Sequence, residues 1–113
     1  SVLEVQQIRR DYFLGPMCGQ WSGKVVPMSE LPLKTDAVDG IAWLPRLMVK
    51  ARLKLRGEMP SDLMYGCGGD RPFLQRMGMT LPGFLELVRD SGDDDRAIIE
   101  AVKRSRDGAS GRG

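Results

Sequence analysis

The sequence predicts an all-α fold, a compact single-domain bundle of about five short helices with a long irregular N-terminal connection. Three observations support this prediction. Apolar residues recur with helical spacing in several segments, capping and stop residues bracket those segments, and no apolar run has an evident partner strand. The chain has 113 residues, which suits one domain. We place this domain at residues 1–106 and expect the Gly- and Ser-rich residues 107–113 to form a disordered tail.

The first helix is predicted at residues 1–14. Val5, Ile8 and Tyr12 fall on one stripe of this helix, and a Gly-Pro pair follows as a stop signal. Residues 15–39 then mix glycines and prolines with scattered apolar side chains, and they show no sustained period. A long stretch of this kind inside a compact domain is usually functional or flexible, so we predict an irregular connection here.

The clearest helix is predicted at about residues 43–56, with Pro45 in its first turn and Gly57 as its stop. Six apolar side chains occupy one arc of this helix, which is the predicted core face. They are Ile41, Leu44, Leu47, Met48, Ala51 and Leu55. Val49 and Leu53 lie opposite this arc and are expected to be exposed, which suggests a second layer, a partner or a ligand wall on that side.

The same helix carries five cations and no acid. These cations lie on two flanks and are Arg46, Lys50 and Lys54 on one, with Arg52 and Arg56 on the other. Arginine forks suit carboxylate and phosphate groups, so Arg46, Lys50 and Arg52 are candidate ligand-binding residues. The default interpretation is a solvated face with ion pairs to acids such as those at residues 93–95. Arg52 is favoured as the exception, since it borders the apolar arc and is placed to enter a pocket or to pair with Asp70.

Three shorter helices are predicted after this one, and each begins at a residue that can accept hydrogen bonds at a helix N-terminus. The capping residues are Asp70, Thr80 and Asp93. The predicted helix ends are Met77, Arg89 and Arg106. The last two helices carry inward-facing apolar triplets at Phe84, Leu85 and Val88 and at Ile98, Ile99 and Val102.

Composition excludes several classes of function. The formal net charge of +2 is too small to indicate nucleic acid, and no apolar run approaches the roughly 20 residues that cross a bilayer. The chain has no histidine and two cysteines. We therefore expect no metal site, no cofactor and no catalysis of the cysteine-protease kind. The low cysteine count favours a reduced, cytoplasmic setting.

The run from Tyr65 to Pro72 is the one segment in which reactive and charged side chains occur together in a pattern that suggests a functional site. Cys67 lies on a glycine-rich turn, with Arg71 and a helix start after it, and this setting favours a thiolate. Burial as a small apolar side chain is the competing and favoured interpretation of Cys67. The turn also resembles an anion cradle of backbone N–H groups, although a tight turn between helices explains its glycines more simply. Tyr65, Asp70 and Glu86 are further candidate proton carriers, and Asp70 is more simply a helix cap.

An ordered series of motifs resembles domain-of-unknown-function family 5069, a bacterial family of small, largely helical proteins. The similarity covers about residues 25–106 and consists of Leu44-Pro45-Arg46, Lys50-Ala51-Arg52, Leu55, Gly57, Tyr65-Gly66-Cys67, Asp70-Arg71, Phe73-Leu74, Gly78 and Phe84-Leu85. The resemblance implies a helical single domain and brings no activity, substrate or cofactor. Its shared polar positions correspond here to Arg46, Lys50, Arg52, Tyr65, Cys67, Asp70 and Arg71, the same area that the residues themselves indicate.

The sequence leads to one main functional hypothesis. We expect a small-molecule-binding domain, with a cofactor-independent enzyme acting on an anionic or carboxylate-bearing substrate as one form of it. Arg46, Lys50, Arg52 and Arg71 are the candidate ligand-binding residues, and Cys67, Tyr65 and Asp70 are the candidate catalytic residues. The alternative is a non-catalytic interaction module that forms a homodimer, and so a homo-oligomer, or binds an acidic partner through Val49 and Leu53. Nucleic acid is ranked below both, and no membrane partner is expected.

Overall fold

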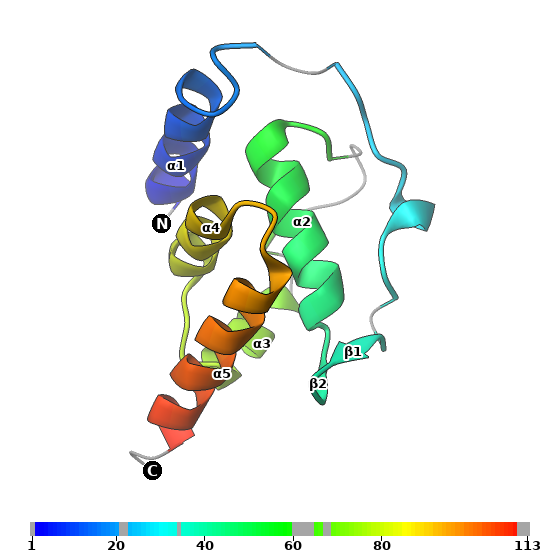
Figure 1. Cartoon of the computed structure of the whole chain (residues 1–113), viewed down its shortest axis with the longest axis vertical. Helices are drawn as coiled ribbons and strands as arrows, with labels where there is room; N and C mark the ends of the chain where they lie inside the picture. Colours follow the sequence, from blue (N-terminus) through cyan, green and yellow to red (C-terminus); the bar gives the residue numbers. More distant parts are fainter. Residues whose placement is uncertain (1, 21–22, 34, 60–64, 67–68, 111–113) are drawn as a thin grey trace.

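Five α-helices make up most of the part of the chain that the structure describes, residues 2–20, 23–33, 35–59, 65–66 and 69–110 (Figure 1). This computed structural model confirms the predicted mostly helical fold. In chain order the elements are α1 (Val2–Leu14), the 3-10 helix η1 (Met28–Glu30), β1 (Ala37–Val38), β2 (Ile41–Ala42), α2 (Leu44–Arg56), α3 (Asp70–Arg76), α4 (Leu81–Ser91) and α5 (Asp95–Ser110).

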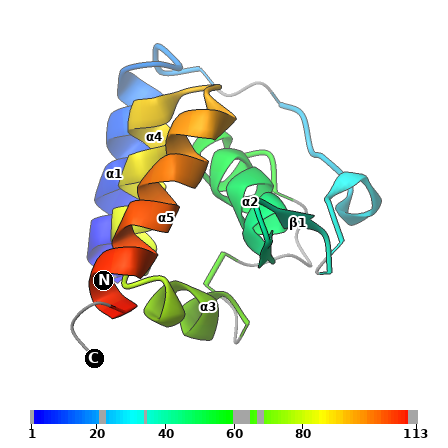
Figure 2. The ribbon, with the colours of Figure 1, turned by 60° about the horizontal axis from the view of Figure 1, so that its bottom comes forward.

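Helices α1, α2 and α4 pack against one another, and α5 packs on α4. Figure 2 shows α1, α4 and α5 running side by side, with α2 next to them and the short α3 across one end. The facing sides of these helices form one apolar core. It contains Ile8 of α1 and the predicted inward triplets of α4 and α5, which are all 4% exposed or less. Burial of these stripes, rather than intrinsic helix propensity, stabilises helices of this length.

Helix α2 is the central element and agrees with its predicted boundaries. Pro45 lies in its first turn, and Gly57 follows its last residue with a φ of 68°. All six side chains of the predicted core face are buried.

The opposite face of α2 differs from the prediction. Leu53 is only 5% exposed and Val49 is half-buried, so the expected exposure is wrong for Leu53. The irregular connection is tied to this helix, because Arg46 Nη1 donates to the carbonyl of Pro32 at 3.0 Å. Leu31 in the same connection is also buried, and both leucines lie outside the main core cluster. Of the three predicted alternatives for this face, a second layer agrees with the burial.

A two-stranded hairpin, which was not predicted, precedes α2. Strand β1 pairs antiparallel with β2, and Val38 lies opposite Ile41. The two turn residues, Asp39 and Gly40, have φ values of 52° and 79°. Positive φ at both central residues is what a type I′ turn requires, and Asp-Gly between apolar residues is a strong short-range signal for it. The sequence therefore contained evidence for this hairpin.

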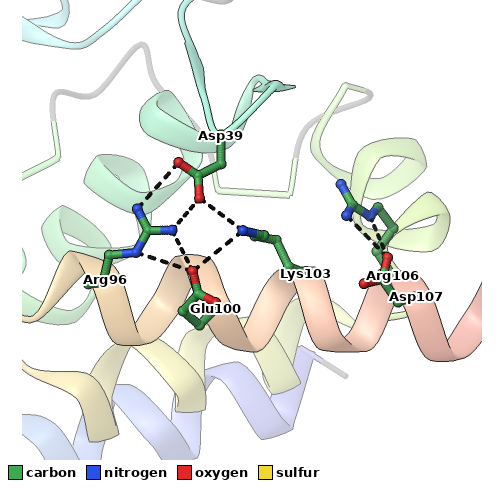
Figure 3. Close-up of polar contacts among 6 residues, drawn as sticks. All are labelled: Asp39, Arg96, Glu100, Lys103, Arg106 and Asp107. Atoms are coloured by element: carbon green, nitrogen blue, oxygen red, sulfur yellow. Dashed lines mark hydrogen bonds and ion pairs between the residues drawn. The ribbon is translucent and has the colours of Figure 1, made fainter.

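The hairpin turn is fastened to α5 by charges (Figure 3). Lys103 Nζ donates to Asp39 Oδ2 at 3.0 Å, and Arg96 Nη1 donates to Asp39 Oδ1 at 3.3 Å. Arg96 also forms ion pairs with Asp39 and with Glu100 through Nη2. Hydrogen bonds from Arg96 and Lys103 lower the pKa of Asp39 to about 2. We call these four residues, Asp39, Arg96, Glu100 and Lys103, the hairpin clasp.

The helix caps are partly as predicted. Thr80 caps α4, since its Oγ1 accepts a hydrogen bond from the backbone N–H of Gly83 at 3.1 Å. The predicted cap of the last helix is wrong by one residue, because Asp94 rather than Asp93 accepts from the N–H of Ala97, at 3.1 Å. Asp93 instead forms an ion pair with α2.

Helix α5 is longer than predicted. It continues past Arg106 to Ser110, so part of the segment 107–113 that was predicted to be disordered is helical. Residues 111–113 lie outside the described part of the chain. Among the described residues, no helix combines the length and the apolar character that crossing a bilayer requires.

Candidate functional site

A buried ion pair lies between α2 and the start of α3. Lys50 and Asp70 are 2% and 0% exposed, and Lys50 Nζ lies 2.7 Å from Asp70 Oδ2. Two other groups donate to the same carboxylate. The Nε1–H of Trp43 donates to Oδ1 at 2.9 Å, and the backbone N–H of Gly66 donates to Oδ2 at 2.9 Å. The structure therefore brings two predicted site residues together, but in the interior and not on a surface.

The surroundings of Asp70 keep its carboxylate ionised. Burial favours the protonated acid, but the hydrogen bonds from Lys50, Trp43 and Gly66 outweigh burial, so the pKa of Asp70 lies below its usual value. Asp70 is the first residue of α3 and makes no side-chain capping hydrogen bond, so the prediction that it caps this helix is wrong. The reason is electrostatic, because a buried ammonium group requires a counter-charge more than a helix terminus requires a cap.

Two backbone features allow Trp43 to reach this carboxylate: the conformation of Trp43 itself and the glycine at position 69. Trp43 precedes α2 with a φ of 78°, which is uncommon for a residue other than glycine. Gly69 lies against the indole ring, and a Cβ atom at this position would collide with the ring carbons. Gly69 therefore gives space to a side chain of the protein itself.

Tyr65 is packed next to this ion pair and already donates its hydroxyl hydrogen. Its OH donates to the carbonyl oxygen of Leu81 at 2.7 Å. Burial, together with the negative charge of Asp70, raises the pKa of Tyr65 far above its ordinary value. The hydroxyl is therefore held as a neutral donor that joins the segment before α3 to the start of α4.

Two of the predicted ligand-binding arginines contact other parts of the protein. Arg46 donates to the irregular connection, as described above. Arg52 Nη2 lies 2.5 Å from Asp95 Oδ1, so Arg52 pairs with the start of α5 and not with Asp70. Acids at residues 93–95 therefore form ion pairs with the second cationic flank of α2, since Arg56 also pairs with Asp93. This agrees with the default interpretation of these charges.

The cysteines do not form part of the site as it is described. Cys67 lies outside the described residues, so its predicted chemistry stays a prediction. Cys18 is exposed, in the turn after α1. In the described parts of the chain, no group of three or more Asp, Glu, His or Cys side chains is close enough to hold a metal ion.

A small pocket lies where α1, α2 and the starts of α3 and α4 meet. Its volume is about 160 Å³. We call it the basic pocket, because three of its lining residues are cations, one from each of α1, α2 and α3. The lining residues are Val5, Gln6, Arg9, Lys54, Tyr65, Arg71 and Leu81.

Both arginines of the basic pocket are oriented by a backbone carbonyl. Arg9 Nε donates to the carbonyl of Lys54 at 3.1 Å, and Arg71 Nε donates to the carbonyl of Gly66 at 3.2 Å. Each guanidinium is thus held by its inner nitrogen, and the described residues place no hydrogen bond or ion pair on its outer nitrogens. Fixing a planar fork in this way reduces the entropy that it loses on binding an oxyanion.

The charges of the basic pocket are of one sign. Burial, and then the positive charge of Arg9, lower the pKa of Lys54. Within the described residues, neither arginine nor Lys54 lies at ion-pair distance from a carboxylate. An anion entering this pocket would therefore relieve an existing repulsion.

Two lining residues of this pocket were candidate site residues from the sequence. Tyr65 and Arg71 were candidate site residues, and the structure places both in its wall. Arg9 and Lys54 were missed as pocket residues. Lys54 was recognised as a flank cation of α2, one helical turn after Lys50, but its distance from α1 is a property of the tertiary fold and has no local signal.

The comparisons with known proteins give a single positive result. The family model described as Domain of unknown function (DUF5069) matches residues 32–111, which is more than half of the chain. This range includes α2 to α5, and α1 lies before it. No curated protein and no solved structure matches the chain.

Proposed function

The chain belongs to the DUF5069 family, whose description names no activity, and we propose that it is a small-molecule-binding protein whose ligand carries an anionic group. The ligand's anionic group would bind in the basic pocket, between the outer nitrogens of Arg9 and Arg71 and the ammonium group of Lys54. The observation that carries this proposal is the convergence of three cations from three helices on one small hollow.

The proposal follows from the physical chemistry of the pocket. Charge-assisted hydrogen bonds from arginine to an oxyanion are stronger than those between neutral groups. The guanidinium groups are oriented before binding, and Val5 and Leu81 add apolar side chains to the pocket lining. A volume of about 160 Å³ suits a small charged group and not a whole drug-sized molecule, for which roughly 300–1,000 Å³ is typical.

The proposal is for binding and does not extend to catalysis. Asp70 is buried against Lys50 with a lowered pKa, so it is a poor proton donor near neutral pH. The Tyr65 hydroxyl donates to a backbone carbonyl and resists ionisation. General acid–base chemistry requires a group that titrates near the working pH and reaches the substrate. We therefore assign Tyr65 to the wall of the basic pocket and Asp70 to the buried ion pair with Lys50.

The alternative hypothesis, an interaction module, depended on an exposed apolar pair on α2. Burial of Leu53 removes half of that patch. No second observation favours this alternative, and homo-oligomer formation stays a prediction.

Titration with sodium acetate, followed by two-dimensional NMR of the amide and arginine Nε–H groups, tests the proposal. Acetate supplies an oxyanion without a large apolar part, and NMR detects weak binding. We expect saturable shifts of the Arg9 and Arg71 Nε–H signals at low ionic strength, where charge interactions are least screened. Arg71→Ala is expected to reduce the acetate affinity about tenfold or more, as for loss of a hydrogen bond to a charged group.

Arg104→Ala is the matched control, because Arg104 is an exposed cation of α5 and lines none of the pockets described here. It removes the same net charge, and we expect it to leave the acetate shifts unchanged. Shifts no larger than those caused by equal sodium chloride, or an equal loss in both variants, would show that the basic pocket does not bind anions.

A further inference from the structure

The basic pocket has an apolar neighbour. A second pocket, of about 220 Å³, lies between the end of α3 and the start of α4. We call it the apolar pocket, since four of its lining residues are Leu74, Met79, Leu81 and Pro82. The remaining lining residues are Arg71, Gln75 and Thr80.

The walls of the apolar pocket belong to well-packed parts of the fold. Leu74 and Leu81 are members of the main core cluster, and Met79 packs against it. The turn between the two helices is closed by a hydrogen bond from the N–H of Met79 to the carbonyl of Leu74, at 2.8 Å. Thr80 Oγ1 is occupied as the cap of α4. The surface that faces a ligand here is therefore mainly apolar and held in place by backbone structure.

The two pockets adjoin at shared residues. Arg71 and Leu81 line both of them. A molecule that crosses this junction meets the cations of the basic pocket at one end and the aliphatic side chains of the apolar pocket at the other. Together the two volumes reach the lower part of the range of roughly 300–1,000 Å³ that is typical of small-molecule sites.

We propose that the ligand of this protein is an amphipathic oxyanion, with its carboxylate or phosphate monoester group in the basic pocket and an aliphatic tail in the apolar pocket. This inference rests on the proposed function and specifies its ligand class. Arg71 is the residue at the junction, where it contacts the head group while its aliphatic stem lies beside the tail. A polyanion without an apolar part would leave the second pocket unfilled.

A chain-length series tests the inference. Acetate, butanoate and hexanoate are titrated into the protein at constant ionic strength, together with hexyl phosphate and the uncharged hexanol. We expect affinity to rise with tail length, by up to about fourfold for each methylene group that becomes buried. Comparison of hexanoate with hexyl phosphate identifies the preferred head group.

Met79→Asn is the matching variant, because Met79 lines the apolar pocket and does not line the basic one. We expect it to flatten the chain-length series and to leave acetate affinity unchanged. Leu33→Asn is the control, since Leu33 is 65% exposed and lines none of the pockets described here. Nuclear Overhauser contacts between hexanoate methylene protons and the methyl groups of Met79 and Leu81, in the unmodified protein, give a readout that does not depend on a variant folding.

The outcomes separate the two proposals. If acetate binds and Arg71→Ala abolishes binding, but hexanoate binds no more tightly than acetate, the ligand class is wrong and the proposed function stands. If hexanol binds as tightly as hexanoate, and neither responds to Arg71→Ala, the proposed function is wrong because the charges make no contribution. Hexanoate contacts confined to residues outside the apolar pocket would also overturn the inference.

Discussion

At the scale of single residues, the buried Lys50 determines which groups pack around it. Lysine is almost never fully buried unless it is paired, and here its buried ammonium group pairs with the carboxylate of Asp70. Asp70 in turn holds the indole of Trp43 and the backbone of Gly66, so α2, α3 and the segment before α3 meet at one pair of charges. The Lys50–Asp70 pair thus links these elements to one another and has a structural role.

Asp70→Asn is expected to destabilise the protein by about 3–5 kcal/mol, because it removes the carboxylate with which the buried Lys50 ammonium group pairs. Lys50→Met leaves the carboxylate unpaired and is expected to act in the same direction. The double variant is expected to recover part of the loss, since no unpaired buried charge remains in it. Urea unfolding of the four proteins measures these differences in the free energy of unfolding.

Glu86→Gln is the control for this cycle, because Glu86 is an exposed carboxylate of α4 and its loss is expected to change stability by about 0.5 kcal/mol or less. Additive losses in the double variant, or single variants that match this control, would show that Lys50 and Asp70 do not depend on each other.

At the scale of elements, the sequence predicted the helices well where two kinds of signal agreed. Helix α2 has an apolar arc, a proline in its first turn and a glycine stop, and its boundaries were correct. The hairpin was missed although its Asp-Gly turn is a strong signal, because its strands are two residues each and carry no period of their own. Short strands that are stabilised by contacts to helices have little local pattern.

The same reasoning explains the candidate site. Arg71 and Tyr65 were found because they stand in a local run of unusual residues, next to a glycine-rich turn. Arg9 lies on a helix whose sequence marks only its apolar stripe, and nothing local indicates that it faces the end of α2. The burial of Lys50 was likewise invisible, since a cation on a helix flank looks the same whether or not a carboxylate from another helix covers it.

The hairpin clasp leads to a prediction about how much its ion pairs contribute to stability. Asp39→Asn keeps a residue that tolerates the positive φ of the turn and removes only the charge. We expect a small fall in melting temperature at pH 7, at most a few degrees, because the ion pairs of the clasp are exposed to solvent. Added salt should diminish the difference between the two proteins.

The pH dependence of this difference has a defined sign. The pKa of Asp39 is lowered to about 2 in the folded protein, against about 3.9 for an unfolded chain. Its contribution is therefore present above about pH 4 and is lost as the pH falls towards 2, where the stabilities of Asp39→Asn and the unmodified protein converge. Asp107→Asn is the control, because among the described residues the ion-pair partner of Asp107 is its neighbour Arg106 within α5 (Figure 3). A gap that persists at pH 2 would contradict the electrostatic origin of the clasp.

At the scale of the whole molecule, the question is whether α1 folds as one unit with the other helices. Helix α1 precedes the segment that matches the family model, yet it packs on both α2 and α4 and supplies three of the residues that line the basic pocket. Among the side chains of α1 at residues 3–14, Ile8 is the buried one, at 4% exposure. If α1 belongs to the same cooperative unit as the other helices, a cavity made at this position must lower the stability of the entire fold.

Ile8→Ala is therefore expected to reduce the free energy of unfolding by about 2–4 kcal/mol, through lost burial and the cavity left behind. The fluorescence of Trp43, measured in a Trp21→Phe background, reports the joint between α2 and α3, far along the chain from the substitution. In a cooperative molecule its transition must shift together with the helical circular dichroism. Leu3→Ala, at a position 79% exposed on the same helix, is expected to leave both transitions unchanged. If Ile8→Ala lowers only part of the helical signal and leaves the Trp43 transition in place, α1 unfolds independently, and the basic pocket then lacks a fixed third wall.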